Sequence, residues 1–92
     1  MLRFELCFSE NAYDALVRVT KRERDSVREI CSLICCFPEM AADRIVPGSE
    51  GGEVYYKETS RFEIKYLVDH AVREVRIIDF ARRRPKHKKS LG

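Results

Sequence analysis

The chain has 92 residues, 45% of them apolar and 36% charged, with a formal net charge of +3. This length allows one domain with a two-layer core, and the composition excludes a disordered protein. No apolar run approaches the ~20 residues that span a bilayer, and the first residues, MLRFELCFSE, lack the apolar block of a signal peptide. We therefore expect a cytoplasmic protein with no membrane partner.

The N-terminal segment predicts a strand followed by a helix. Apolar residues occupy every second position from Leu2 to Phe8, which is typical of a half-buried strand. Ser9 then offers an N-cap hydroxyl, and the apolar residues of segment 10–19 recur at helical spacing.

A second helix is expected directly after the first. Thr20 and Glu23 form a capping-box pattern, and Pro38 ends the helical run that follows. The short joint near Val19–Thr20 predicts a helical hairpin, with one long bent helix as the alternative.

The four cysteines are interpreted as core residues. Cys31 and Cys35 are one helical turn apart, and free cysteine is usually a small buried hydrophobe. The chain has no Cys-x-x-Cys pair or nearby histidine to complete a zinc site. We expect no metal and no other cofactor.

The second half of the chain predicts a meander of strands after a loop over 38–52. Tight turns at Thr59-Ser60 and His70-Ala71 make neighbouring strands antiparallel. Three strands are expected: Glu53–Lys57, Arg61–Asp69 and Val72–Phe80. The second alternates most clearly, with Phe62, Ile64, Tyr66 and Val68 expected inward and Glu63, Lys65 and Asp69 outward. In the third, Val75 and Ile77 are expected on one face and Ile78 and Phe80 on the other. The predicted fold is α+β and two-layered, with the N-terminal strand and helical hairpin packed on an antiparallel sheet of about four strands. The helices should cover one sheet face and leave the other open.

Charge divides the chain into a domain over 1–80 and a basic C-terminal tail over 81–92. The tail, ARRRPKHKKSLG, holds six cations and no acid, so the first 80 residues sum to −3. This asymmetry indicates a polyanion or an acidic protein segment as partner, and a tail that only aids solubility is the alternative.

The segment SRFEIKYLVDHAVREVRIIDFARRR is similar to the closing hairpin of one protein family. There an aromatic-Arg-aliphatic-x-Tyr strand leads through an acidic turn to an aliphatic strand with a basic end. The matching residues are Phe62, Ile64, Tyr66, Val68, Asp69, Val75, Ile77, Arg82 and Arg83. With the order of elements, this pattern resembles the RelE/ParE superfamily of toxins from type II toxin–antitoxin systems.

The resemblance implies a ribosome-dependent mRNA interferase whose partners are a cognate antitoxin, the ribosome and mRNA. Such an enzyme transfers a phosphoryl group to the RNA's own 2′-hydroxyl, which needs a base, positive charge at the phosphate and an acid. The catalytic residues implied are Arg83, Arg61 and His87. The RNA-binding residues implied are Lys57, Lys65, Arg82, Arg84, Lys86, Lys88 and Lys89.

Two departures from the family pattern keep other functions open. The terminal tyrosine of the family falls near Lys89, so this chain has no tyrosine there. Glu63 stands where the family has an arginine, and we expect its carboxylate to repel the substrate phosphate. Arg61, two positions earlier, is expected on the same strand face as a spatial substitute. The alternatives are a ParE-type inhibitor of DNA gyrase and a degenerate toxin that only binds its antitoxin.

Three tyrosines have different expected roles. Tyr55 or Tyr56 can stack on a nucleic-acid base, but at least one of the two should be core. Tyr66 is expected in the core. Lys57 and Lys65 have the alternative of being ordinary outward strand residues, and His87 of being a solvated tail residue.

Overall fold

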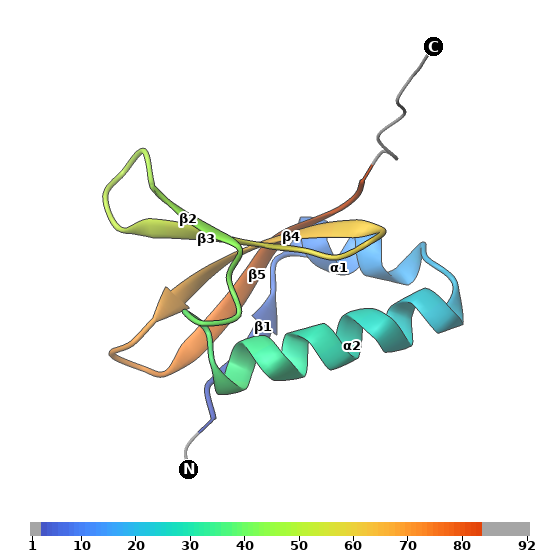
Figure 1. Cartoon of the computed structure of the whole chain (residues 1–92), viewed down its shortest axis with the longest axis horizontal. Coiled ribbons are helices and arrows are strands. Elements are labelled where there is room, and N and C mark those ends of the chain that lie inside the picture. The colour runs from blue at the N-terminus through green and yellow to red at the C-terminus, as the bar shows by residue number, and fades with distance from the viewer. Residues whose placement is uncertain (1–2, 84–92) are drawn as a thin grey trace.

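The structure, a computed structural model, describes residues 3–83 and holds two helices and one five-stranded sheet (Figure 1). In chain order the elements are β1 (Glu5–Phe8), α1 (Glu10–Val17), α2 (Lys21–Cys36), β2 (Arg44–Pro47), β3 (Glu53–Glu58), β4 (Phe62–Asp69) and β5 (Glu74–Arg82). The order of strands in the sheet is β1-β5-β4-β3-β2. The expected α+β class and two-layer arrangement are confirmed.

The sheet differs from the expected one in strand number and in one direction. The additional strand, β2, lies inside the predicted loop and pairs with the edge of β3, where Val46 faces Val54. The first strand, β1, runs parallel to β5, with Leu6 facing Val75, whereas every other pair is antiparallel. The parallel pair is possible because the two helices carry the chain back before the meander begins.

Both predicted helix starts are confirmed. The Ser9 hydroxyl accepts a hydrogen bond from the backbone N–H of Ala12 at 3.1 Å. Thr20 and Glu23 form a complete capping box, in which each side chain accepts the backbone N–H of the other at 3.1 Å. Because α1 ends at Val17 and α2 begins at Lys21, the helices form a hairpin and not one bent helix.

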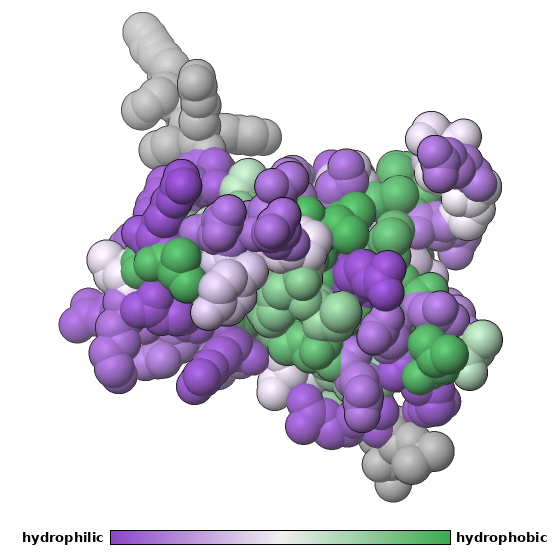
Figure 2. All heavy atoms as spheres, turned by 180° about the vertical axis from the view of Figure 1, so that it is seen from behind, coloured by the Kyte–Doolittle hydropathy of each residue, from purple (hydrophilic) through white to green (hydrophobic). Residues whose placement is uncertain are grey.

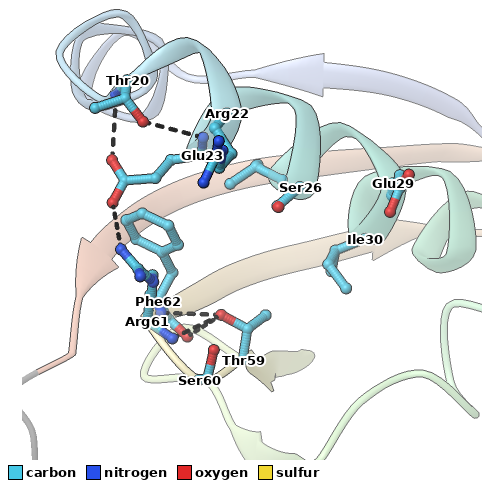
Figure 3. A pocket seen from close by; sticks show the side chains of 11 residues that line it. Thr20, Arg22, Glu23, Ser26, Glu29, Ile30, Thr59, Ser60, Arg61 and Phe62 are labelled. Carbon is cyan, nitrogen blue, oxygen red and sulfur yellow. Dashed lines mark hydrogen bonds and ion pairs between the residues drawn. The ribbon is translucent and has the colours of Figure 1, made fainter.

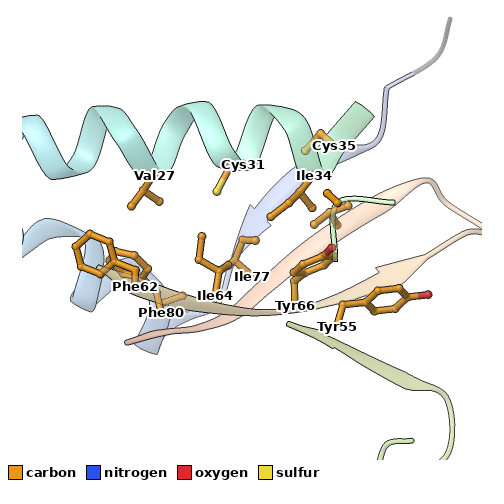
Figure 4. Close-up of a cluster of buried hydrophobic side chains, with 13 residues drawn as sticks. Val27, Cys31, Ile34, Cys35, Tyr55, Phe62, Ile64, Tyr66, Ile77 and Phe80 are labelled. Carbon is orange, nitrogen blue, oxygen red and sulfur yellow. The ribbon is translucent and has the colours of Figure 1, made fainter. Parts of the chain in front are cut away.

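The core lies between α2 and one face of the sheet (Figure 4). The buried side chains of α2 are Val27, Cys31, Ile34 and Cys35, and those of the sheet include Tyr55, Phe62, Ile64, Tyr66, Val75, Ile77 and Phe80. The hydroxyl of Tyr66 donates to the carbonyl oxygen of Pro38 at 2.6 Å, so this buried polar atom is satisfied. The expected core role of Tyr66 is confirmed.

A β-bulge in β5 corrects the expected facing of its side chains. Strict alternation places Phe80 on the opposite face from Ile77. In the structure Tyr66 pairs with Ile77 and Lys65 with Asp79, so Ile78 is an extra residue in the ladder. This insertion returns Phe80 to the core face beside Ile77.

Of the four cysteines expected in the core, Cys31 and Cys35 of α2 are core residues, whereas Cys7 and Cys36 are only partly buried. Cys31 and Cys35 are each 1% exposed and free of disulfides. Burial, and next the neighbouring Cys35, raises the pKa of Cys31 to about 12, so its thiol stays protonated at neutral pH. Within residues 3–83, no three histidine, cysteine or carboxylate side chains lie close enough together to hold a metal ion. Neither described helix is long and apolar enough to cross a membrane.

Candidate functional site on the open sheet face

The sheet face turned away from α2, called here the open face, carries an aromatic ring beside two cations. Tyr56 faces Arg44 on β2 and Lys65 on β4. The guanidinium carbon of Arg44 lies 4.0 Å from the centroid of the Tyr56 ring, and the ammonium nitrogen of Lys65 lies 6.0 Å from it. Tyr55 is buried, so the expectation that at least one tyrosine of this pair is core is confirmed.

Two carboxylates lie next to these cations. Glu58 and Glu63 face each other across β3 and β4, an arrangement that like charges disfavour. Each carboxylate has an arginine partner. Arg44 lies 3.2 Å from Glu63, and Arg83 lies 3.9 Å from Glu58. Arg44, which the sequence predicts in a loop, therefore reduces the repulsion expected from Glu63.

Arg83 is held at the end of the open face by three contacts. Its backbone N–H donates to the carbonyl oxygen of Arg61 at 2.7 Å. Its guanidinium donates to the carbonyl oxygen of Thr59 at 2.6 Å and pairs with Glu58, and the side chain is 33% exposed. Arg83, which directly follows β5, is thus held against the β3–β4 turn and still reaches solvent.

Arg61 and Arg82 lie elsewhere, on the side of the sheet that faces α2. Figure 3 shows Arg61 reaching the carboxylate of Glu23. Arg82 donates to both carboxylate oxygens of Glu23, at 2.8 and 3.3 Å, and Arg61 donates to one of them at 3.3 Å. The expectation that Arg61 shares the face of Glu63 is wrong, because Arg61 precedes β4 in the turn and its side chain reaches α2.

The carboxylate of Glu23 is buried, with 7% of the residue exposed. The hydrogen bond from Arg82 is the main reason that its pKa is lowered to about 2, and the backbone N–H of Thr20 acts in the same direction. Glu23 therefore stays ionised beside its two arginines throughout the physiological pH range.

Lys57 and Lys65 lie on opposite faces of the sheet. Lys57 follows the buried Tyr55 by two residues, so it points to the side of α2, where its ammonium group lies 3.6 Å from Asp43. Of these two lysines, Lys65 is the one on the open face. The remaining predicted site residues, Arg84, Lys86, His87, Lys88 and Lys89, fall outside the described part of the chain.

A groove of about 650 Å³ separates the first half of α2 from the β3–β4 turn (Figure 3). Val27, Ile30 and Phe62 are the apolar residues that line it. Its polar lining includes Glu23 and Arg61, so one side of the groove is closed by the arginine–carboxylate contacts just described.

Sequence reasoning missed two residues of these clusters. The local sequence identifies Glu23 as a helix cap. It cannot predict that Arg61 and Arg82 contact Glu23, because these arginines lie 38 and 59 residues away in the chain. Arg44 was missed because its strand, RIVP, is too short to show a period.

Large apolar side chains are also exposed outside the sheet face. Leu6 on β1 and Tyr13 and Val17 on α1 are among them. Figure 2 shows the side opposite to that of Figure 1, where hydrophobic side chains gather near the middle and hydrophilic ones surround them. The exposed side chains of Leu6, Tyr13 and Val17 offer apolar area to a protein partner.

No protein-family model matches the chain, and no curated protein matches it by sequence. Solved structures match its fold. A chain of the toxin–antitoxin complex RelBE2 from Mycobacterium tuberculosis superposes with a TM-score of 0.78 at 17% identity, covering 90% of this chain and 94% of that one.

Two further structures agree. A chain of the archaeal RelE–RelB complex from Pyrococcus horikoshii OT3 gives a TM-score of 0.74 at 14% identity, covering 89% of this chain and 97% of that one. The isolated RelE toxin from E. coli superposes with a TM-score of 0.72 at 17% identity, covering 90% of this chain and 87% of that one. The chain has the RelE fold.

Proposed function

We propose that this protein is the toxin of a type II toxin–antitoxin system and that it cleaves mRNA on the ribosome. The observation that carries the proposal is Tyr56, which lies between Arg44 and Lys65 on a sheet face that α2 leaves uncovered. A base that stacks on an aromatic ring of an open sheet is a common mode of binding single-stranded RNA, and the Tyr56 ring is partly exposed on this face. The flanking cations then lie where they can bind the adjoining phosphates.

Arg83 is the proposed catalytic cation. Its guanidinium is fixed by the Thr59 carbonyl and remains partly exposed at the end of the same face. A fixed positive charge stabilises the crowded phosphate during attack by the 2′-hydroxyl. His87 keeps its proposed role as acid or base, and Arg84, Lys86, Lys88 and Lys89 keep their proposed role in holding the RNA backbone.

The contacts of Glu23 change the proposal for two arginines. Arg61 and Arg82 share the carboxylate of Glu23 on the other side of the sheet. They are therefore proposed as structural residues and not as ligands of the phosphate. Lys57, paired with Asp43, is likewise left out of the RNA site.

The proposed partner is a cognate antitoxin. Two of the similar structures are complexes of RelE with RelB, and the exposed apolar side chains of β1 and α1 provide area for a bound segment. The proposed target, the translating ribosome, is cytoplasmic. We retain the division into a domain over 1–80 and a basic tail over 81–92 as a proposal, with the note that β5 continues through Arg82.

The test is a cell-free translation reaction in which the mRNA is mapped by primer extension, with and without ribosomes. The wild-type protein is expected to cut mRNA inside codons only when ribosomes are present. Arg83→Ala is expected to lower the cleavage rate at least ~100-fold, the scale of removing one fixed charge-stabilising group. Arg28→Ala, which removes an exposed arginine of α2, is the matched control and should cut like wild type. Intact mRNA with undisturbed translation would reject the proposal.

A gyrase inhibitor is the second candidate, favoured by one specific observation. The charged residues of the open face, called here the open-face cluster, are Arg44, Glu58, Glu63, Lys65 and Arg83. Both of its arginines are already paired with carboxylates, Arg44 with Glu63 and Arg83 with Glu58. Paired cations bind phosphate less well than free ones, whereas a protein target tolerates them. A DNA-supercoiling assay with purified gyrase separates the two candidates, because only a gyrase inhibitor slows it. A protein inert in both assays corresponds to the degenerate toxin that only binds an antitoxin.

A further inference from the structure

Glu23 is the one buried charged side chain among the residues that the structure describes. Its carboxylate receives hydrogen bonds from three parts of the chain. Thr20 donates its backbone N–H at 3.1 Å, Arg82 donates at 2.8 and 3.3 Å, and Arg61 donates at 3.3 Å. One carboxylate thus joins the start of α2 to the start of β4 and the end of β5.

These contacts fix the direction of the last two described residues. Arg82 is tied to Glu23 and lies over the ring of Phe62, with its guanidinium carbon 5.2 Å from the ring centroid. Successive side chains of a strand point to opposite faces. With Arg82 held toward α2, Arg83 is directed to the other side, where it contacts Thr59 and Glu58.

We propose that Glu23 is a positioning residue that decides which arginine of the C-terminal run faces the target. It holds Arg82 and Arg61 on the α2 side and thereby fixes Arg83 at the open face. The functional part of this inference rests on the proposed function, whereas the structural part does not.

A substitution can separate two roles of Glu23, the capping of α2 and the holding of Arg61 and Arg82. Glutamine also serves in a capping box, since its side-chain oxygen accepts the N-cap backbone N–H. Glu23→Gln therefore keeps the cap and removes the charge that holds the two arginines. Asp25→Asn is the matched control, because Asp25 is an exposed carboxylate of the same helix whose partner, Lys21, lies 3.6 Å away.

The structural arm measures amide hydrogen exchange in the full chain, at a temperature where all variants are folded. The amide of Arg83 reports on the end of β5, because it donates to the carbonyl oxygen of Arg61. In Glu23→Gln we expect this amide to exchange about 10-fold faster or more, while the amides of Cys31 and Ile34 in α2 keep their rates. Asp25→Asn should leave all three unchanged. An Arg83 exchange rate equal to that of wild type would overturn the inference.

The functional arm is a double-mutant cycle in the translation assay. Glu23→Gln is expected to lower the cleavage rate about 10-fold, as a displaced catalytic group does. Added to Arg83→Ala, it should cause no further loss, because its effect passes through Arg83. If the double variant instead loses cleavage rate by the product of the two single-variant factors, the positioning role of Glu23 is overturned. If wild type fails to cut mRNA while the Arg83 amide responds to Glu23→Gln, the proposed function is rejected and the positioning of Arg83 stands.

Discussion

Two clusters of arginines and carboxylates lie on opposite sides of the same sheet. On the α2 side, the carboxylate of Glu23 is buried, whereas the two arginines that converge on it, Arg61 and Arg82, are largely exposed. On the open face, Arg44 and Glu63 form a pair in which both side chains are partly exposed. Exposed pairs contribute little to stability, because water and salt screen them. The α2-side cluster therefore serves the fold, and the open-face cluster remains available to a ligand.

The neighbours Arg82 and Arg83 show the same contrast within one strand end. They carry the same charge and are adjacent in sequence, but Arg82 binds a buried carboxylate and Arg83 lies near the candidate RNA site. What an arginine binds is thus decided by the face on which it lies, and not by the density of charge around it in the sequence.

The largest expected effect on stability comes from a substitution in β4, where the neighbours Ile64 and Lys65 face opposite sides of the sheet. Ile64 is fully buried, so Ile64→Ala should lower the free energy of unfolding by about 2–5 kcal/mol through lost burial and a cavity. Lys65→Ala should leave that free energy within about 0.5 kcal/mol of wild type. Urea unfolding measures both. Equal losses in the two variants would contradict the assignment of Lys65 to the open face.

Tyr56 provides the next test, on binding rather than folding. Tyr56→Ala should weaken binding of single-stranded RNA by about 1–3 kcal/mol, the range for loss of one base–aromatic stack. Tyr56→Phe keeps the ring and should bind like wild type. Fluorescence titration with a short oligonucleotide measures the affinities. An alanine variant that binds as well as wild type would remove Tyr56 from the site.

Low pH should remove the contribution of Glu23, in the α2-side cluster, to the stability of the fold. The pKa of Glu23 is about 2 in the folded protein, below its ordinary value of 4.5, chiefly because Arg82 donates to the ionised form. The unfolded chain thus takes up the proton first as pH falls. The contribution of Glu23 to stability is full above pH 4.5 and is lost between pH 4.5 and 2. Unfolding curves of wild type and Glu23→Gln should accordingly converge over that interval, and a constant difference would argue against the ionised pair.

The smallest expected effect on folding belongs to the open-face pair. Glu63→Gln should change the free energy of unfolding by less than about 1 kcal/mol, because the Arg44–Glu63 pair is partly exposed. The same change frees Arg44 and should strengthen RNA binding, most clearly at low salt, where charge contacts are strongest. Affinity measured at two salt concentrations checks this, and weaker binding would assign Glu63 a direct role in holding the RNA.

Several features of this protein were determined by the sequence alone, because they depend on neighbours in the chain. Ser9 and the Thr20–Glu23 box set the helix starts, and the alternation over Arg61–Asp69 predicted β4 and its buried Ile64. The placement of Lys65 on the outward face followed from the same alternation.

The tertiary structure decided the features that depend on residues far apart in the chain. The short strand β2 exists because β3 offers an edge to pair with. β1 can pair parallel to β5 because a long crossover that includes both helices separates the two strands in the chain. The bulge at Ile78 reverses the face expected for Phe80. Arg61 and Arg82 contact Glu23 only when α2 is packed on the sheet. Periodicity specifies which side chains share a face, but partners 38 or 59 residues apart are brought together only by packing.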